Sequence, residues 1–379
     1  MQDNDVASEF PDPRSSDYYN TAGSGLCPVT VRDQVKQYVE ASCADAIGAS
    51  QKYAPYVEVL RGHLARLLGC TGAELALMHH TAEGANVIAH GLQWQEGDTI
   101  MTLDREYPST VYPWMNVQKL HNVHLVLLEE RDGRIEEDEI VKALHRERPR
   151  LLAMSAVEWC TGYRFDLQKI GEACGELGIF FFVDAAQSLG FWEIDVEACK
   201  ISALAGSAWK WLFGPLGMGY LYLRGDLLER VTPLFVGSES VVNPREYLRY
   251  DFTFQPDMRR FEYSTMNLSA VVWLEAGIRF VQQQGLERIR MHVFDLQDYA
   301  LERLRDFGCT VRGDLPRERR SGIIGFRHPK IGSRELATRL YREAAIIARE
   351  RDGFVRLSFH LYNHRPGIDQ LIDLVTHMA

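Results

Sequence analysis

A carboxylate stands at the end of a strongly apolar stretch, residues 179–190, which read IFFFVDAAQSLG. Five apolar residues lead into Asp184, and Gln187 follows three positions later. A carboxylate at the end of a buried strand is costly unless a positive group meets it. Taken alone, Asp184 has a second interpretation as the N-cap of a following helix.

A lysine stands between two tryptophans in residues 203–224, ALAGSAWKWLFGPLGMGYLYLR. A run of small residues ends near Ser207, and Lys210 lies between Trp209 and Trp211. Partial desolvation lowers the pKa of an amine towards the nucleophilic free base. A solvated surface lysine is the alternative, and the neighbouring indoles disfavour it.

Asp184 and Lys210 lie 26 residues apart, each at the end of its own predicted strand. This is the pair that a pyridoxal 5'-phosphate (PLP) site needs. The lysine forms the Schiff base, and the carboxylate keeps the pyridine nitrogen protonated so that the ring can accept electrons. We therefore expect PLP as the cofactor.

The elements that position these residues are short β-rich runs that alternate with helical patterns. Strands are predicted at 75–78, 99–103, 124–128, 151–155, 179–184, 203–206 and 219–223, with helices such as 137–146 and 167–177 between them. This alternation indicates a mainly parallel sheet covered on both faces. Ligands bind outside the carboxyl ends of such strands, which is where the aspartate and the lysine stand.

The expected fold is α/β, with a large domain built on a mainly parallel mixed sheet and a small C-terminal α+β domain. We expect a flexible or lightly docked arm at residues 1–17 and the large PLP-binding domain at 18–255, whose N-terminal segment contributes to the small domain. The small domain covers 256–379. Its patterns predict helices at 269–283, 286–307, 334–342 and 368–376 and strands at 323–326 and 354–358.

Composition excludes several classes of function. The chain has 379 residues, enough for one large and one smaller domain, and 46 % of them are hydrophobic. The net charge of −10 argues against a binder of nucleic-acid backbones. The polar N-terminus and the lack of a long apolar run predict a cytoplasmic protein without membrane contact. The seven cysteines are scattered, and neither their spacing nor that of the histidines matches a metal-binding or redox motif.

The stretches around Asp184 and Lys210 both resemble the class V aminotransferase family of fold-type I PLP enzymes. This family includes cysteine desulfurases, selenocysteine lyases, kynureninases and isopenicillin N epimerase-like proteins. The matching signature is VDAAQSLG, followed by SAWKWLFGPLGMG. The resemblance extends from YYNTAGSGL at 18–26 to RLSFHLYN at 356–363, and so covers most of the chain.

The resemblance implies roles for the residues around the cofactor ring. Lys210 would form the Schiff base and move the proton at Cα. Asp184 would pair with the pyridine nitrogen, and Gln187 would donate a hydrogen bond to the phenolic oxygen. Tyr107 would stack on the ring, although an aromatic residue before proline is often only a packing residue.

The same resemblance implies a phosphate cradle in HHTAEGAN, residues 79–86. Thr81 and the Ala82 N–H would open a helix whose positive end suits an anion, and Ser207 would add a hydroxyl. Without the family, Thr81 is a good N-cap. Thr265, in RFEYSTMN, matches a residue that reaches the phosphate of the neighbouring subunit's cofactor, which implies a homodimer with shared sites.

Arg356 matches the family arginine that binds the substrate α-carboxylate, for which a guanidinium fork has the right shape. The alternative is a surface arginine in an Arg-rich tail. The R-x-S-x-x-x-Y-N context favours the binding role.

Three features depart from the family pattern. Trp209 replaces the usual histidine before the Schiff-base lysine, and its indole N–H can donate to the phosphate but cannot accept. Trp159 stands where desulfurases carry an asparagine. Desulfurases also carry a nucleophilic cysteine shortly before the carboxylate-binding arginine, whereas this chain has no cysteine after Cys309. A desulfurase reaction needs that thiolate, so it is disfavoured.

We therefore expect β-elimination from a cysteine-derived amino acid, the C–S lyase type of reaction. Transamination and isopenicillin N epimerase-like racemisation are the alternatives, because the cofactor permits all three and the pocket selects among them. A PLP-binding sensor without turnover is an alternative of another class. A nicotinamide-dependent dehydrogenase is set aside, since no G-x-G-x-x-G follows an early strand.

Overall fold

A seven-stranded sheet forms the centre of the larger part of the molecule in this computed structural model, which describes residues 3–130 and 135–378. The strands are β1 (Leu75–Met78), β2 (Thr99–Leu103), β3 (His124–Leu128), β4 (Leu151–Ser155), β5 (Phe180–Asp184), β6 (Ala203–Ser207) and β7 (Gly219–Leu223). Their order is β1-β7-β6-β5-β4-β2-β3, and only β7 runs antiparallel to its neighbours. The mainly parallel mixed sheet is confirmed.

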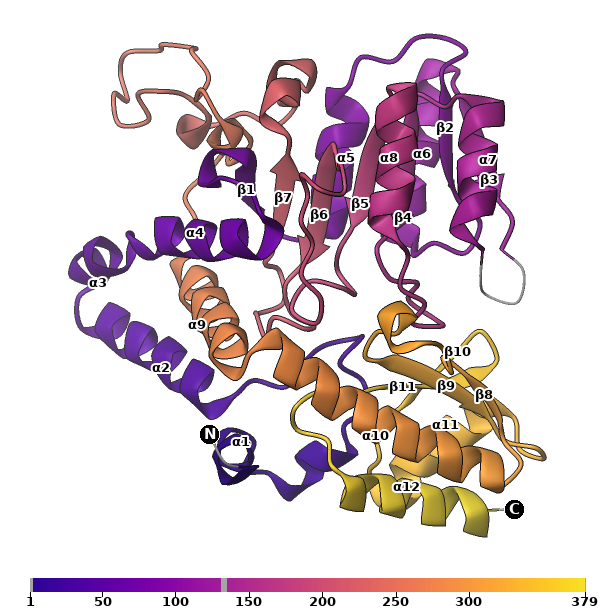
Figure 1. The fold of residues 1–379 in the computed structure, drawn as a ribbon. Coiled ribbons are helices and arrows are strands. Elements are labelled where there is room, and N and C mark those ends of the chain that lie inside the picture. Colours follow the sequence, from indigo (N-terminus) through magenta and orange to yellow (C-terminus); the bar gives the residue numbers. More distant parts are fainter. Residues whose placement is uncertain (1–2, 131–134, 379) are drawn as a thin grey trace.

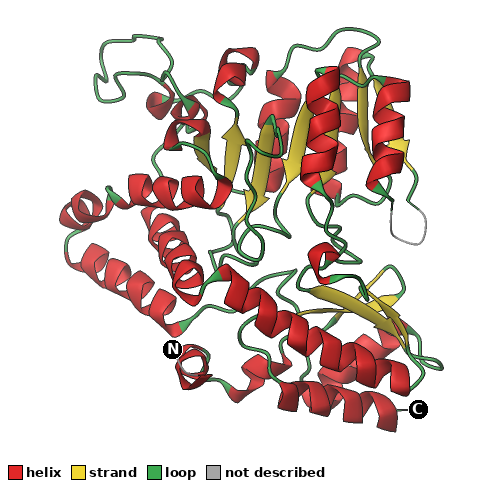
Figure 2. Ribbon diagram, in the orientation of Figure 1, coloured by secondary structure: helices red, strands yellow, loops and turns green. Residues whose placement is uncertain are grey.

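Helices cover both faces of this sheet (Figure 2). Helices α7 (Glu137–Glu147) and α8 (Leu167–Leu177) lie on one face, with α5 (Thr81–Gly91) and α6 (Pro108–His121) on the other (Figure 1). Successive residues of β5 therefore enter two different cores, Phe181 with α7 and α8 and Phe182 with α5 and α6. Burial on both faces explains why these strands are continuously apolar rather than alternating.

A second sheet of four antiparallel strands, in the order β10-β11-β9-β8, lies near the C-terminus. Its strands are β8 (Thr310–Arg312), β9 (Ile323–Arg327), β10 (Arg349–Arg351) and β11 (Phe354–Ser358). Helices α10 (Leu286–Asp306), α11 (Ser333–Ala344) and α12 (Arg365–His377) pack beside it (Figure 1). The sequence patterns did not predict β8 and β10, because each has three residues and no apolar alternation.

The helices of the N-terminal region are α2 (Val29–Ala44), α3 (Ala46–Tyr53) and α4 (Tyr56–Leu68). Helix α9 (Leu268–Gln284), more than 200 residues later, packs against α2 and α4. Chain segments from both predicted domains therefore share this helical layer. The predicted domain boundary at residue 255 stays a prediction.

The N-terminal segment before residue 18 is docked on the body of the protein. It contains α1 (Asp3–Glu9) and a 3-10 turn, Pro13–Asp17. Phe10 is buried, with ring centroids 5.9 Å from Phe213 and 5.1 Å from Tyr362. This aromatic packing holds the segment in place together with hydrogen bonds from the Thr30 N–H to Glu9 at 2.8 Å and from the Asn363 amide to the Ser16 carbonyl at 3.0 Å.

Neither a membrane-spanning helix nor a metal cluster is present in the part of the chain that the structure describes. Within it, no helix combines the length and apolarity required to cross a membrane. Within the same residues, no group of three or more histidine, cysteine or acidic side chains is arranged to hold a metal ion.

Candidate active site

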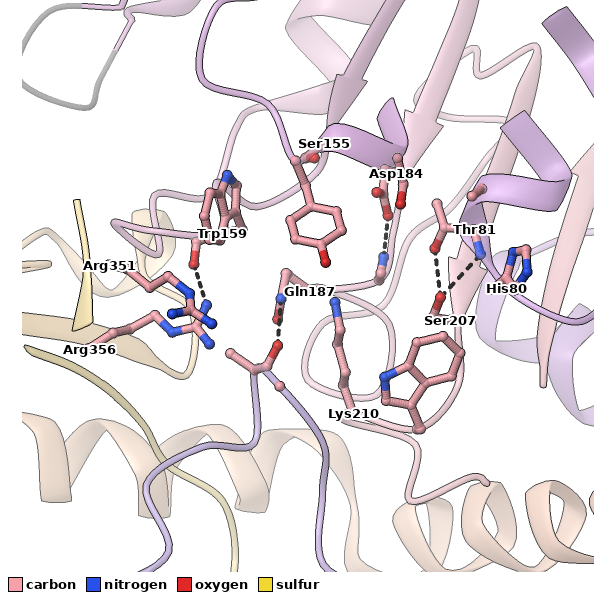
Figure 3. A pocket seen from close by; sticks show the side chains of 17 residues that line it. His80, Thr81, Ser155, Trp159, Asp184, Gln187, Ser207, Lys210, Arg351 and Arg356 are labelled. Carbon is pink, nitrogen blue, oxygen red and sulfur yellow. Dashed lines mark hydrogen bonds between the residues drawn. The ribbon is translucent and has the colours of Figure 1, made fainter. Parts of the chain in front are cut away.

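A pocket of about 340 Å³ opens at the carboxyl ends of the central strands, where the second sheet meets them (Figure 3). This is the volume range of small-molecule sites. Nine of the ten residues predicted for the site line it: Thr81, Ala82, Tyr107, Asp184, Gln187, Ser207, Trp209, Lys210 and Arg356. Thr265 does not line this pocket and is exposed.

One end of the pocket combines the start of α5 with the end of β6. The Ser207 hydroxyl accepts a hydrogen bond from the Thr81 N–H at 3.1 Å and lies 2.9 Å from the Thr81 hydroxyl. The Ala82 N–H has no partner among the described residues. Hydroxyls and a free N–H at the start of an 11-residue helix are a fitting cradle for a phosphate.

The expectation that Thr81 is the N-cap of this helix is wrong. The N-cap is His80, whose backbone is extended at φ −169° and whose Nδ1 accepts a hydrogen bond from the Glu83 N–H at 3.0 Å. Thr81 is therefore the first helical residue. Since His80 does the capping, the Thr81 side chain is free to face Ser207 and the pocket.

Lys210 lies in the middle of the pocket, between its two ends (Figure 3). Burial lowers the pKa of this amine to about 8, Asp184 opposes the shift, and the positive charge of Arg356 adds to it. Its Nζ lies 5.8 Å from the centroid of the Tyr107 ring. The expected partial desolvation of this lysine is therefore present, and neutral amine is available near physiological pH.

Asp184 ends β5 as a buried carboxylate held by two hydrogen bonds. The Thr110 hydroxyl donates to Oδ2 at 2.9 Å, and the Ala186 N–H donates to Oδ1 at 2.8 Å. Burial raises the pKa of Asp184, whereas Lys210 and these two donors oppose the rise. The alternative of a helix N-cap is wrong, because no helix follows β5 before β6.

Gln187 is oriented by two neighbours. Its Nε2 donates to the Ala22 carbonyl at 2.9 Å, and its Oε1 accepts from the Trp211 indole at 3.0 Å. An amide nitrogen carries two hydrogens, so one donor remains for a ligand. This leaves the side chain able to play the donor role that the family resemblance implies.

Aromatic side chains form one wall of the pocket. The rings of Tyr107 and Trp159 meet edge-on, with centroids 5.4 Å apart, and the Trp159 indole donates to the Arg105 carbonyl at 2.9 Å. Tyr107 is 45 % exposed, which disfavours the alternative of a packing residue. Trp209 also lines the pocket. The stacking role of Tyr107 stays a prediction.

Arg356 lies on β11 of the second sheet and is buried, so the alternative of a surface arginine is wrong. Its guanidinium donates to the Trp159 carbonyl at 2.8 Å, but its Nε is buried without a partner. Burial and the neighbouring Arg351 lower the pKa of Arg356 to about 10. A bound carboxylate would satisfy both the charge and the unpaired donor.

The structure adds lining residues that were not predicted, above all Arg351, Ser155 and His80. Ser155 ends β4, as Asp184 ends β5. A signal for Arg351 existed in the dipeptide Asp352-Gly353, which is typical of a two-residue hairpin turn. Such a turn brings Arg351 back beside the strand that carries Arg356.

These features fit PLP. The Thr81–Ser207 cradle suits its phosphate, the buried Asp184 suits its pyridine nitrogen, and a lysine of lowered pKa suits its aldehyde. The unpaired Ala82 N–H and Arg356 Nε are polar groups that the protein itself leaves unsatisfied.

Comparison with known proteins gives concordant results. The family model for aminotransferase class-V matches residues 17–371. A probable cysteine desulfurase of Pyrococcus abyssi is 26 % identical, over 99 % of this chain and 97 % of that protein.

Two solved structures share the fold. The apo cysteine desulfurase of Thermococcus onnurineus superposes with a TM-score of 0.89 at 24 % identity, covering 99 % of this chain and 97 % of that one. The cystine C–S lyase C-DES, in complex with its product cysteine persulfide, superposes with a TM-score of 0.87 at 21 % identity, covering 97 % and 99 %.

Proposed function

Since the chain belongs to the aminotransferase class-V family, we propose that it is a PLP-dependent β-lyase acting on a cysteine-derived amino acid. The observation that carries this proposal is the content of one pocket. Lys210, Asp184 and Arg356 converge there, and no cysteine is among the described residues that line it.

The protein's own residues divide the work of holding the cofactor. Thr81, the Ala82 N–H and Ser207 bind the phosphate, Asp184 pairs with the pyridine nitrogen, and Gln187 donates to the phenolic oxygen. Trp209, which lines the pocket, adds an indole N–H near the phosphate. Bound PLP supplies an electron sink that makes the proton on the substrate Cα acidic.

Lys210 and Arg356 act on the substrate. Arg356 binds the α-carboxylate and so orients the bond between Cα and its proton. Lys210 Nζ accepts that proton, and the Cβ–S bond breaks with its electron pair leaving on sulfur. The sulfur group departs as a thiol, persulfide or sulfide, and the remaining aminoacrylate hydrolyses to pyruvate and ammonia.

Sulfur transfer to the protein is disfavoured by the positions of the cysteines. Cys160 follows the lining residue Trp159, but burial strongly raises the pKa of its thiol. Cys309 is buried, and burial raises the pKa of its thiol to about 11. Neither is the accessible thiolate that persulfide formation needs. The likeness to a cystine C–S lyase supports release of sulfur instead.

Product analysis tests the proposal. The PLP-loaded enzyme is incubated with L-cystine and with S-conjugates of L-cysteine, and we expect pyruvate, ammonia and the sulfur-containing leaving group in equal amounts. A keto acid that retains the side chain would show that the reaction is transamination rather than elimination. Formation of the D-amino acid would show that the reaction is racemisation. Binding of PLP without any product would indicate a PLP-binding sensor.

We also propose a homodimer, in which Thr265 of each subunit reaches the partner's cofactor phosphate. Residues 234–252 form a loop that stands away from the body of the protein (Figure 1). Six of its apolar side chains are more than half exposed: Leu234, Phe235, Tyr247, Leu248, Tyr250 and Phe252. An exposed apolar surface of this kind supports association. Light scattering tests it, with Leu248→Ser and Tyr250→Ser together expected to shift the mass to the monomer.

A cytoplasmic location belongs to the same proposal. All seven cysteines are free thiols. Unpaired thiols in this number are typical of proteins in a reducing compartment. Fractionation of cells that express the protein, with detection by antibody, tests this location.

A further inference from the structure

The end of the pocket opposite the phosphate cradle contains two guanidinium groups (Figure 3). Arg351 ends β10, and Arg356 lies on β11, the next strand of the same hairpin. The two-residue turn between them, Asp352-Gly353, has φ values of 49° and 75°, a conformation that suits a tight hairpin. This turn brings a second positive charge into the pocket.

The charge of Arg351 is not neutralised by the described residues, none of whose carboxylates forms an ion pair with it. The nearby carboxylates have other partners. Asp352 pairs with Arg105 and Arg312, both at 2.9 Å, and Glu350 accepts from the Gly353 N–H at 2.9 Å. The pocket therefore holds two guanidinium groups that form no ion pair with the described carboxylates, and they lie close enough for Arg351 to lower the pKa of Arg356, although the nearby Glu158 opposes that shift.

Arg351 is nevertheless held in place. Its guanidinium donates to its neighbour's carbonyl, that of Glu350, at 2.7 Å, and its Cζ lies 5.9 Å from the centroid of the Trp159 ring. Its remaining N–H donors have no partner among the described residues. A positioned guanidinium with free donors is suited to a carboxylate, sulfonate or phosphate.

One guanidinium group is enough to bind the α-carboxylate of the substrate, so the other is available for a second group. Arg356 is the more deeply buried, and its Nε is a donor that is both buried and unpaired, so it is the partner of the α-carboxylate. We propose that Arg351 binds a second anionic group, carried by the substituent on Cβ of the substrate. The substrate class is then a cysteine conjugate with an acidic side chain. This inference rests on the proposed function, because it assumes an amino acid oriented by Arg356.

A pair of substrates that differ only in charge tests the assignment. S-Carboxymethyl-L-cysteine carries the second carboxylate, and S-carbamoylmethyl-L-cysteine replaces it with a neutral amide of the same shape. For the PLP-loaded enzyme we expect kcat/KM to favour the acid by about tenfold or more, the range of a hydrogen bond to a charged group. Arg351→Gln is expected to bring this ratio close to one, and Arg351→Lys to leave an intermediate ratio.

Arg342→Gln is the matched control, because it removes the same charge from an exposed position on α11. It is expected to leave the ratio of the two substrates unchanged. If Arg351 instead shared the α-carboxylate with Arg356, Arg351→Gln would lower kcat/KM equally for both substrates. That result, or a wild-type ratio of one, would overturn the assignment.

Binding without turnover separates this inference from the proposed reaction. Tryptophan fluorescence of the loaded enzyme, with Trp159 and Trp209 in the pocket, reports binding of glutarate and of its monoamide, glutaramate. We expect glutarate to bind about tenfold more tightly, and Arg351→Gln to abolish the difference. This result without elimination products would reject the β-lyase and support the acidic substrate. Elimination products without a preference for glutarate over glutaramate would support the β-lyase and reject the acidic substrate.

Discussion

The two ends of the pocket are built differently. The phosphate end uses residues at the strand ends of one sheet, and its hydroxyls already bond to each other, as Ser207 does to Thr81. The substrate end joins the second sheet to loops of the first, through the 2.8 Å bond from Arg356 to the Trp159 carbonyl and the pair between Arg105 and Asp352. Arg351 and Arg356 form no ion pair with a carboxylate among the described residues.

This difference indicates a division of labour. In the proposed function, the first sheet carries the residues that hold the cofactor, and the second sheet carries the two arginines that face the substrate. Four measurements compare the two ends.

Lys210→Ala has the largest expected effect, because it removes the group that accepts the Cα proton. We expect elimination to fall by at least about a hundredfold, while PLP remains bound through the phosphate end. Product formation and PLP retention after gel filtration measure the two effects. Lys119→Ala, at an exposed position of α6, is the control. Complete loss of PLP from a folded Lys210→Ala protein would show that the cradle contributes little.

Arg356→Gln is expected to act on the substrate end alone. It should lower kcat/KM by about tenfold to a hundredfold, since a hydrogen bond to a charged group is lost, and leave PLP affinity unchanged. Arg356→Lys should recover part of the loss, because an ammonium keeps the charge but not the fork. A matching fall in PLP affinity would contradict the separation of the two ends.

Ser207→Ala gives the converse result. It removes a hydroxyl that contacts Thr81 and that we propose binds the phosphate, so the dissociation constant of PLP should rise by about tenfold. At saturating PLP, the KM for the amino acid should stay at its wild-type value. Titration of the apoprotein with PLP and steady-state kinetics measure the two quantities. An altered KM at saturating PLP would show that the phosphate end affects binding at the substrate end.

The pKa of Lys210 predicts how PLP capture depends on pH. Neutral amine attacks the aldehyde, and burial lowers the pKa of this amine to about 8. The rate at which the apoprotein captures PLP should therefore fall about fivefold from pH 8 to pH 7 and level off above pH 9. Stopped-flow absorbance follows the reaction. A rate that still rises about sevenfold between pH 9 and pH 10 would indicate an ordinary solvated lysine.

Much of the fold could be predicted because apolar runs that end at small or charged residues mark the strands of a buried sheet. The runs that end at Ser155, Asp184 and Ser207 correspond to β4, β5 and β6. The short edge strands β8 and β10 were not predicted, because three residues are too few to show an alternation of apolar and polar side chains. The N-cap at His80 escaped because histidine is a rare cap, and Thr81 beside it has the commoner residue type.

The sequence by itself predicted the cofactor and the residues that we propose hold it, because Asp184 and Ser207 each end their own strand within a local pattern. It also showed that the C-terminal stretch lacks a cysteine. Only the tertiary structure decided that Arg351 faces Arg356, that both guanidiniums lack a carboxylate partner among the described residues, and that Trp159 lies beside them. These facts depend on how two sheets pack across about 200 residues of chain, and no local period records such packing.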